Sequence, residues 1–160
     1  MAIKDSGKTR EFETGAHRDA SIGKGRCDLL PLMEVADVMD DEVLRYIAMF
    51  FINKKEQHLI NALIFALPLI PEYNNDFPTM MLEVSHLYEE GANKYGENNW
   101  KKGMPLKVYL DSGIRHYLKA LRGDNDEPHY RGFVWNILGC LWTMHHVKGA
   151  LEEFKEFAKE

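Results

Sequence analysis

The chain has 160 residues, of which 45% are hydrophobic and 28% charged, and its formal net charge is -5. This balance predicts a single domain with a sizeable core, and the acidic charge argues against a nucleic-acid scaffold. The two cysteines, Cys27 and Cys140, have no paired spacing, and no apolar run is long enough to span a bilayer. A disulfide framework, a zinc ribbon and a membrane segment are therefore not expected.

The first 32 residues show neither helical nor strand periodicity, and we expect an ordered, non-helical segment there. Gly23 and Gly25 alternate with Lys24 and Arg26, downstream of Arg18. Glycines let backbone N–H groups approach an anion closely, and Lys and Arg supply the countercharge. The pattern favours a loop that holds phosphate groups, although a solvated basic leader would show the same residues.

The rest of the chain shows apolar residues at helical spacing, punctuated by Pro and Gly. Thr79 is expected to cap the third helix, and Trp100 falls in a turn-rich link between the third and fourth. No convincing strand run is present. The predicted fold class is all-α, a helical bundle that forms one domain over residues 1–160. The expected helices cover residues 38–54, 56–67, 79–95, 105–123, 128–146 and 151–158.

The third expected helix carries a face of ligating side chains. Glu83, His86 and Glu90 lie at i, i+3 and i+7, beside the apolar stripe of the helix. Carboxylates at this spacing can point several oxygens at one hard cation. A solvated polar face would show the same spacing.

A second group lies at the start of the fifth expected helix. Asp126, His129 and Asn136 align along one face, and Asn136 lies deep in an otherwise apolar helix. A buried amide needs hydrogen-bond partners, because leaving it unpaired costs free energy. Asn136 is thus either part of a site or bonded to neighbouring backbone.

The fourth expected helix carries Asp111, Arg115 and His116. Asp111 and Arg115 have the i,i+4 spacing of an ion pair, and His116 is a core histidine, a ligand or a proton shuttle. The chain has no nucleophile elbow, zinc-protease helix, Walker loop or dinucleotide fingerprint. A bundle with inward-facing acids and histidines suits metal ions, and metal ions suit phosphate chemistry.

Short blocks throughout the chain share their residues and their order with one known family. They are Glu13-Thr14-Gly15-Ala16 with Arg18-Asp19, Gly23-Lys24-Gly25-Arg26 with Asp28-Leu29-Leu30-Pro31, Tyr88 to Gly96, Asn99-Trp100 with Gly103, Asp111-Ser112, Arg115-His116, Gly123-Asp124, Asp126 to His129, and Trp135-Asn136. In these blocks the chain resembles the dATP/dGTP diphosphohydrolase N-terminal family of phages and bacteria. Residues 33–76 have no counterpart that we can place and look like an inserted pair of helices.

The resemblance implies a relative of the MazG-like all-α nucleoside triphosphate pyrophosphatases. Such proteins use Mg²⁺ to hydrolyse a nucleotide between its α- and β-phosphates. In phages whose DNA carries 2-aminoadenine, relatives convert dGTP to dGMP for synthesis of the modified nucleotide. The relatives place Glu-x-x-Glu on one helix and Glu-x-x-Asp, followed by Asn, on a later one. Here His86 and His129 stand where a carboxylate is usual, and Mn²⁺ tolerates that change better than Mg²⁺.

The resemblance also implies roles for individual residues in hydrolysis of dGTP or dATP. The cations neutralise the triphosphate, Tyr95 or Trp100 stacks on the base, and Asn99 reads its edge. The expected metal ligands are Glu83, His86, Glu90, Asp126 and His129. The expected catalytic residues are Glu83, Glu90, His116 and Asp126. The expected substrate-binding residues are Arg18, Lys24, Arg26, Lys94, Tyr95, Asn99, Trp100, Arg115 and Asn136.

Two alternatives keep the fold without the turnover: a nucleotide-binding module that does not hydrolyse, and a structural helical interaction protein. MazG-like enzymes are generally oligomeric, so a homo-oligomer in the cytoplasm is expected, in the host cytoplasm if the chain is phage-encoded. Neither nucleic acid nor membrane is expected as a partner. Apolar residues of the inserted helices are expected either to form the contact between copies or to complete the core within one chain. They are Ile47, Phe50, Phe51, Leu63 and Phe65.

Overall fold

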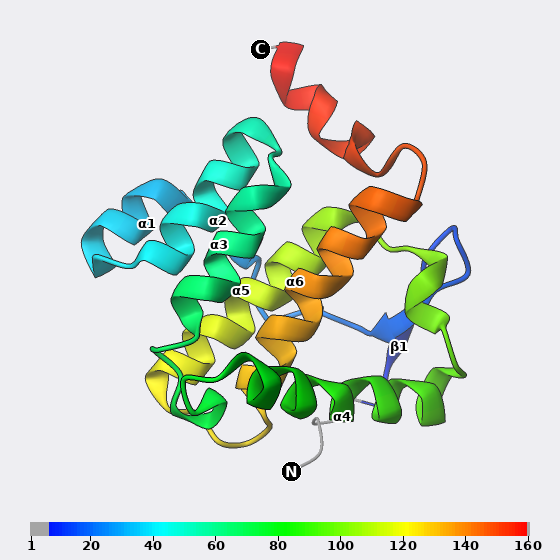
Figure 1. Cartoon of the computed structure of the whole chain (residues 1–160). Coiled ribbons are helices and arrows are strands. Elements are labelled where there is room, and N and C mark those ends of the chain that lie inside the picture. Colours follow the sequence, from blue (N-terminus) through cyan, green and yellow to red (C-terminus); the bar gives the residue numbers. More distant parts are fainter. Residues whose placement is uncertain (1–6, 160) are drawn as a thin grey trace.

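The computed structural model describes the backbone of residues 7–159 and the side chains of residues 7–154. Six α-helices make up most of this part, which confirms the all-α class (Figure 1). They are α1 (Leu32–Met39), α2 (Glu42–Asn53), α3 (Glu56–Ala66), α4 (Phe77–Tyr95), α5 (Leu106–Arg122) and α6 (His129–His146). Short 3-10 turns are η1 (Cys27–Leu29), η2 (Pro71–Tyr73) and η3 (Asn99–Lys102). The helix expected over residues 151–158 lies within a longer 3-10 helix, η4 (Ala150–Lys159), rather than an α-helix.

Helices α5 and α6 pack along each other and form the centre of the molecule, and α4 crosses α6 (Figure 1). The apolar stripe of α5 is buried at Leu110, Ile114 and Tyr117, facing Phe133 and Ile137 of α6. Gly123 ends α5 in the left-handed region with φ 84°, as its position after the last apolar turn predicts. This pair of helices supplies one wall of the site described below.

Two helix starts differ from the sequence expectation. The helix expected over residues 38–54 begins later, at Glu42, as α2, and the preceding helix α1 was not expected. Asp40 ends α1 with a left-handed φ of 50°, and the Oδ1 atom of Asp41 accepts from the Leu44 amide over 2.8 Å as the cap of α2. Thr79 is not a cap. Helix α4 begins at Phe77, and the Thr79 hydroxyl donates to Asp76, the residue before the helix, over 2.7 Å.

Residues 32–76 hold three helices and one 3-10 turn, rather than a pair of helices. Their apolar side chains complete the core within the chain at Ile47, Phe50 and Leu63, which are at most 6% exposed. Phe51 is partly buried against the same core, whereas Phe65 is 41% exposed. Of the two roles expected for these residues, the structure shows the internal one for Ile47, Phe50 and Leu63. The homo-oligomer stays a prediction.

The N-terminal segment contains a strand pair that the sequence pattern did not indicate. Strands β1 (Thr9–Glu11) and β2 (His17–Asp19) pair antiparallel, with Arg10 opposite Arg18. Gly15, at φ 85°, lets the chain turn between them. The hairpin is held by η3, because the backbone N–H and C=O of His17 bond to both ends of the Asn99 side-chain amide over 2.9 and 2.8 Å. No helix within residues 7–159 has the length and apolar character needed to cross a bilayer.

Candidate functional site

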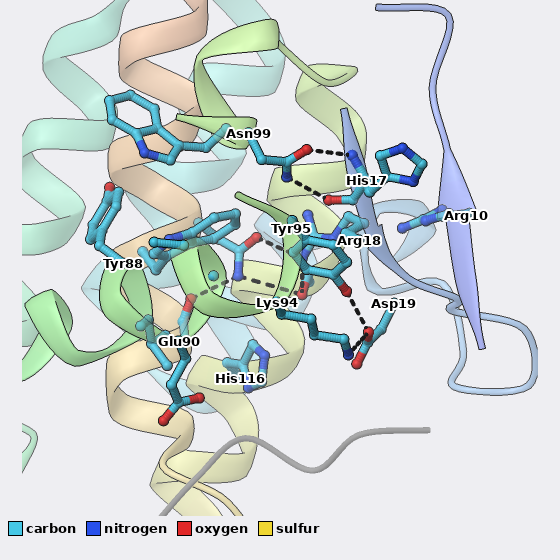
Figure 2. A pocket seen from close by; sticks show the side chains of 18 of the residues that line it. Arg10, His17, Arg18, Asp19, Tyr88, Glu90, Lys94, Tyr95, Asn99 and His116 are labelled. Carbon is cyan, nitrogen blue, oxygen red and sulfur yellow. Dashed lines mark hydrogen bonds and ion pairs between the residues drawn. The ribbon is translucent and has the colours of Figure 1, made fainter. Parts of the chain in front are cut away.

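A cavity of about 240 Å³ lies between the hairpin, α4, η3 and the α5–α6 pair (Figure 2). Its lining combines cationic, aromatic, carboxylate and imidazole side chains from segments that are far apart in the sequence. The residues expected from sequence that line it are Arg18, Lys24, Glu90, Lys94, Tyr95, Asn99, Trp100, Arg115, His116 and Asn136. The expected residues outside this lining are Arg26, Glu83, His86, Asp126 and His129.

Arg18 carries its guanidinium into the interior beside the cavity. The Nη2 atom donates to Ser112 Oγ over 3.1 Å and to Asn136 Oδ1 over 3.2 Å, while Nη1 is buried without a hydrogen-bond partner among the described residues. The guanidinium carbon lies 5.5 Å from the centre of the Trp135 ring and 5.9 Å from that of Tyr109. Burial lowers the pKa of Arg18 to about 10, so the group stays charged at neutral pH. A buried cation with an unused N–H donor is suited to an anionic or carbonyl ligand.

Residues 23–26 form a loop, here called the strap, that is fixed by α5. The Arg115 side chain donates to the carbonyl oxygens of Lys24 over 3.2 Å and Gly25 over 2.8 Å. Asp111 pairs with Arg115 over 2.6 Å and accepts from the Cys27 amide over 2.6 Å. Asp111 and Arg115 are 4% and 8% exposed, so this pair is buried rather than a surface ion pair. It orders the strap and leaves the Lys24 side chain to line the cavity.

Aromatic rings form two groups in the lining of the cavity, here together called the aromatic wall. Tyr88 lies edge-on to Trp100 with ring centres 5.5 Å apart, and tilted against Trp135 at 6.1 Å. Tyr95 stacks on His17 at 6.4 Å and donates its hydroxyl hydrogen to Asp19 over 2.7 Å. Such surfaces accept a planar base.

Lys94 also bonds to Asp19, over 2.7 Å, so its ammonium group lies at the edge of the cavity beside β2 (Figure 2). Asn99 lines the cavity but uses both ends of its amide to hold the backbone of His17. Asn136 donates to the Gly132 carbonyl over 2.7 Å and accepts from Arg18. The buried amide of Asn136 therefore has hydrogen-bond partners both in its own helix and in Arg18, which lines the cavity.

Imidazoles meet at the end of the cavity where α5 and α6 touch. His116 Nδ1 and His129 Nδ1 are 2.9 Å apart, and the Oε1 atom of Glu127 lies 3.7 Å from the first and 3.4 Å from the second. Burial, and next the neighbouring His129, lower the pKa of His116 to about 3, so its ring is neutral at physiological pH. His129 Nε2 lies 2.7 Å from Asp126 Oδ1. His116 and Glu127 line the cavity, and His129 lies behind them.

Two groups of ligating atoms in the described part of the chain lie close enough to hold a metal ion. One consists of His116, Glu127 and His129, and the other of Asp124, Asp126 and His129. Both include His129, and neither includes a residue of α4. Of the five metal ligands expected from the sequence, Asp126 and His129 belong to these groups, and Glu83, His86 and Glu90 do not.

Three of the expected residues have other partners or other places. The carboxylate of Glu83 accepts from Arg131 over 2.8 and 3.0 Å and from Tyr130, and the hydrogen bond from Arg131 lowers the pKa of Glu83. Arg26 makes a two-pronged ion pair with Asp28, with both distances 2.7 Å. His86 is exposed on α4.

Other lining residues were missed from the sequence. Tyr88, Ser112, Glu127 and Trp135 each lie inside a block of the family resemblance, and Glu127 and Trp135 directly adjoin an expected site residue. Their position in those blocks is the sequence feature that could have identified them as site residues. Arg10 and His17 carried no such signal, because they reach the cavity through the hairpin.

The chain matches one family model. The family model described as dATP/dGTP diphosphohydrolase, N-terminal, matches residues 54–153 of the chain. The match starts just before α3 and includes α4, α5 and α6 with their cavity residues, whereas the hairpin and the strap precede it. No curated protein and no solved structure matches the chain.

Proposed function

Because the chain belongs to the dATP/dGTP diphosphohydrolase, N-terminal family, we propose that it hydrolyses a purine deoxynucleoside triphosphate, dGTP or dATP, to the monophosphate and pyrophosphate. The observation that carries the proposal is the composition of one cavity lining. Arg18, Lys24 and Lys94 supply positive charge, aromatic rings supply a surface for a base, and His116 and Glu127 supply ligating atoms. Metal-assisted hydrolysis of a nucleotide requires these three things: countercharge for the phosphates, a surface that binds the base, and ligands for the metal ion.

The phosphates would lie against the cations of the hairpin, the strap and α4. Arg18 supports this placement most strongly, because its buried Nη1 lacks a hydrogen-bond partner among the described residues. A phosphate oxygen would supply both the missing acceptor and the opposite charge. Arg115 would act indirectly, since its donors hold the strap and Asp111.

The base would stack within the aromatic wall, on Trp100 or Tyr95, beside Tyr88 and Trp135. Asn99 receives a different role from the one expected. Its amide already bonds both backbone groups of His17, so we assign it to holding the hairpin against η3 rather than to reading the base edge.

A divalent cation, Mg²⁺ or Mn²⁺, would be held around His129, where imidazole nitrogens and carboxylate oxygens lie together in the two groups described above, and Mn²⁺ tolerates the imidazoles better. When bound, such an ion supplies Lewis-acid polarisation of a phosphate oxygen and of the attacking water. Glu90, which lines the same cavity, would accept the proton of the water as its oxygen attacks the α-phosphorus and pyrophosphate leaves.

The test is to incubate the purified protein with dGTP or dATP and Mg²⁺ or Mn²⁺, and to separate the products by anion-exchange chromatography. We expect deoxynucleoside monophosphate and pyrophosphate in equal amounts. Calorimetric binding of the nucleotide without products would favour the non-hydrolysing module. Absence of both binding and products would favour the structural interaction protein.

A further inference from the structure

Three ligating atoms converge where α5 meets the start of α6: Nδ1 of His116, Nδ1 of His129 and Oε1 of Glu127. We propose that they form a preformed site for a first-row transition-metal ion of the Zn²⁺, Co²⁺ or Mn²⁺ kind, occupied before any nucleotide arrives. This names the cation class and the ligands of the proposed function. Binding of the ion does not depend on the proposed function, whereas its part in a reaction rests on that function.

The distances suit a metal ion. The three atoms are separated by 2.9, 3.4 and 3.7 Å. A point about 2 Å from each of them lies close to their common plane, and about 2 Å is the length of a bond from a transition ion to imidazole nitrogen or carboxylate oxygen. An ion at that point would have three protein ligands. Because His116 and Glu127 line the cavity, its remaining positions would face the cavity, as in catalytic rather than structural sites.

A second feature fixes the nitrogen lone pair of His129. The side chain of His129 is 1% exposed, and its Nε2 lies 2.7 Å from Asp126 Oδ1. A carboxylate accepts, so the proton of a neutral His129 sits on Nε2, and Nδ1 carries a lone pair aimed at His116 and Glu127. Histidines that bind metals are oriented by this kind of carboxylate contact at their other nitrogen. Asp126 is thereby a positioning residue rather than a ligand.

The ring of His116 is fixed by its packing against α6. A Cβ atom placed on Gly132 would lie 2.6 Å from His116 Cδ2 and 2.8 Å from Nε2, so the ring rests on bare backbone. Ligands held in place before binding reduce the ordering cost that an ion must overcome.

The donor set selects the class of ion. Two imidazoles and one carboxylate suit Zn²⁺, Co²⁺ and Mn²⁺, whereas Mg²⁺ prefers oxygen ligands and keeps its water. The other group, around Asp124, is less suited. The carboxylate of Asp124 is held by Arg122 through two contacts, and Asp126 already bonds to His129.

The experiment titrates Co²⁺ into metal-stripped protein without nucleotide and follows the visible d–d absorption of the bound ion. Wild-type protein should take up one equivalent, and Zn²⁺ should displace it. Glu127→Gln and His116→Gln should each weaken Co²⁺ binding at least tenfold. His145→Gln is the matched control, because His145 also contacts a carboxylate, that of Glu56, but on the surface. Circular dichroism verifies the fold of each variant.

Three results would overturn the proposal: no absorption with wild-type protein, unchanged binding in Glu127→Gln, or loss of binding in Asp124→Asn with retention in Glu127→Gln. Absence of absorption with wild-type protein would mean that a shared proton, and not a metal ion, joins the imidazoles of His116 and His129. Hydrolysis of dGTP measured on the same samples separates this proposal from the function. Turnover with Mg²⁺ but no Co²⁺ site would remove the site alone, and Co²⁺ uptake without turnover would remove the hydrolase alone.

Discussion

Arg115 donates from Nη2 to the carbonyl oxygen of Gly25 over 2.8 Å, so helix α5 holds the strap by its backbone. The same guanidinium bonds to the Lys24 carbonyl and to Asp111, which also accepts from the Cys27 amide. These bonds fix the backbone of Lys24, whose side chain lines the cavity. The buried pair therefore links the core of the bundle to the phosphate end of the proposed site.

Replacing Arg115 tests that link. Arg115→Met should raise the KM for dGTP at least tenfold with a smaller change in kcat, because Lys24 loses its position while the ligating residues stay. It should also lower the free energy of unfolding by about 3 kcal/mol, since a buried Asp111 loses its partner. The double variant Asp111→Leu with Arg115→Met should recover much of that stability and keep the raised KM. A double variant with normal KM would contradict the link, and Arg45→Met on the distant surface of α2 is the control.

Arg18 should matter for ligand binding and not for folding. Arg18→Met removes a buried charge that no carboxylate pairs with at hydrogen-bond distance, so the free energy of unfolding of the free protein should not fall. Nucleotide affinity should drop by roughly ten- to a hundredfold, because a charge-assisted contact to phosphate is worth about 1.5–3 kcal/mol. Isothermal titration with dGTP and thermal denaturation measure the two effects. Unchanged affinity would remove Arg18 from the site.

Glu83 and Glu90 lie on the same helix and should respond differently. Glu83→Gln should cost about 1 kcal/mol of stability, because Arg131 loses a charged acceptor, and should leave hydrolysis near the wild-type rate. Since the pKa of Glu83 is lowered in the folded state, this contribution is present above the ordinary Glu pKa and is lost as the pH falls through the lowered value. Urea unfolding at pH 7 and at pH 3 checks this difference.

Glu90→Gln is the matched variant. It should lower kcat at least tenfold with little effect on stability, because Glu90 lines the cavity. Loss of turnover in Glu83→Gln would restore the role expected for Glu83 from the sequence, and normal turnover in Glu90→Gln would remove Glu90 from the site.

Gly132 and Gly91 form a second matched pair. Gly132→Ala places a methyl group 2.6 Å from the His116 ring, so the ring must move, and hydrolysis should fall at least tenfold. Gly91→Ala meets nothing within 4 Å and should add up to about 1 kcal/mol of stability through helix propensity. Steady-state rates and thermal denaturation compare the two. Equal loss of activity in both would show that the cavity tolerates no added methyl, and would remove the specific role of the contact between Gly132 and His116.

The sequence predicted α2 to α6 because each carries its own apolar period, whereas α1 was not predicted. It did not predict the hairpin, whose strands have three residues each and no apolar alternation. Its stability comes from tertiary contacts, such as those of His17 with Asn99 and of Thr14 with the Gly103 carbonyl. A periodicity argument sees only neighbours along the chain, and these partners are 82 or more positions away.

The resemblance located the cavity better than the spacing of acids did. Spacing placed Glu83 and Glu90 on one face of α4. Spacing fixes only the direction of the Cβ atom and not the partner of the carboxylate, and in the structure Arg131 from α6 binds Glu83. The sequence pattern did not indicate Glu127, because Asp126 and His129, which lie on either side of it, already have the three-residue spacing expected of ligands. Which acid of that turn faces His116 depends on the backbone path at the start of α6, and no pattern in the residues encodes it.

We propose that water attacks the α-phosphorus of a purine deoxynucleotide held in this cavity. Hydrolysis of dGTP in ¹⁸O-labelled water, with the products resolved by mass spectrometry, shows which phosphorus the water attacks. We expect one ¹⁸O atom in the monophosphate and none in the pyrophosphate, with this labelled product greatly reduced in Arg18→Met. Label in the pyrophosphate, release of nucleoside diphosphate, or no product with either Mg²⁺ or Mn²⁺ would contradict it.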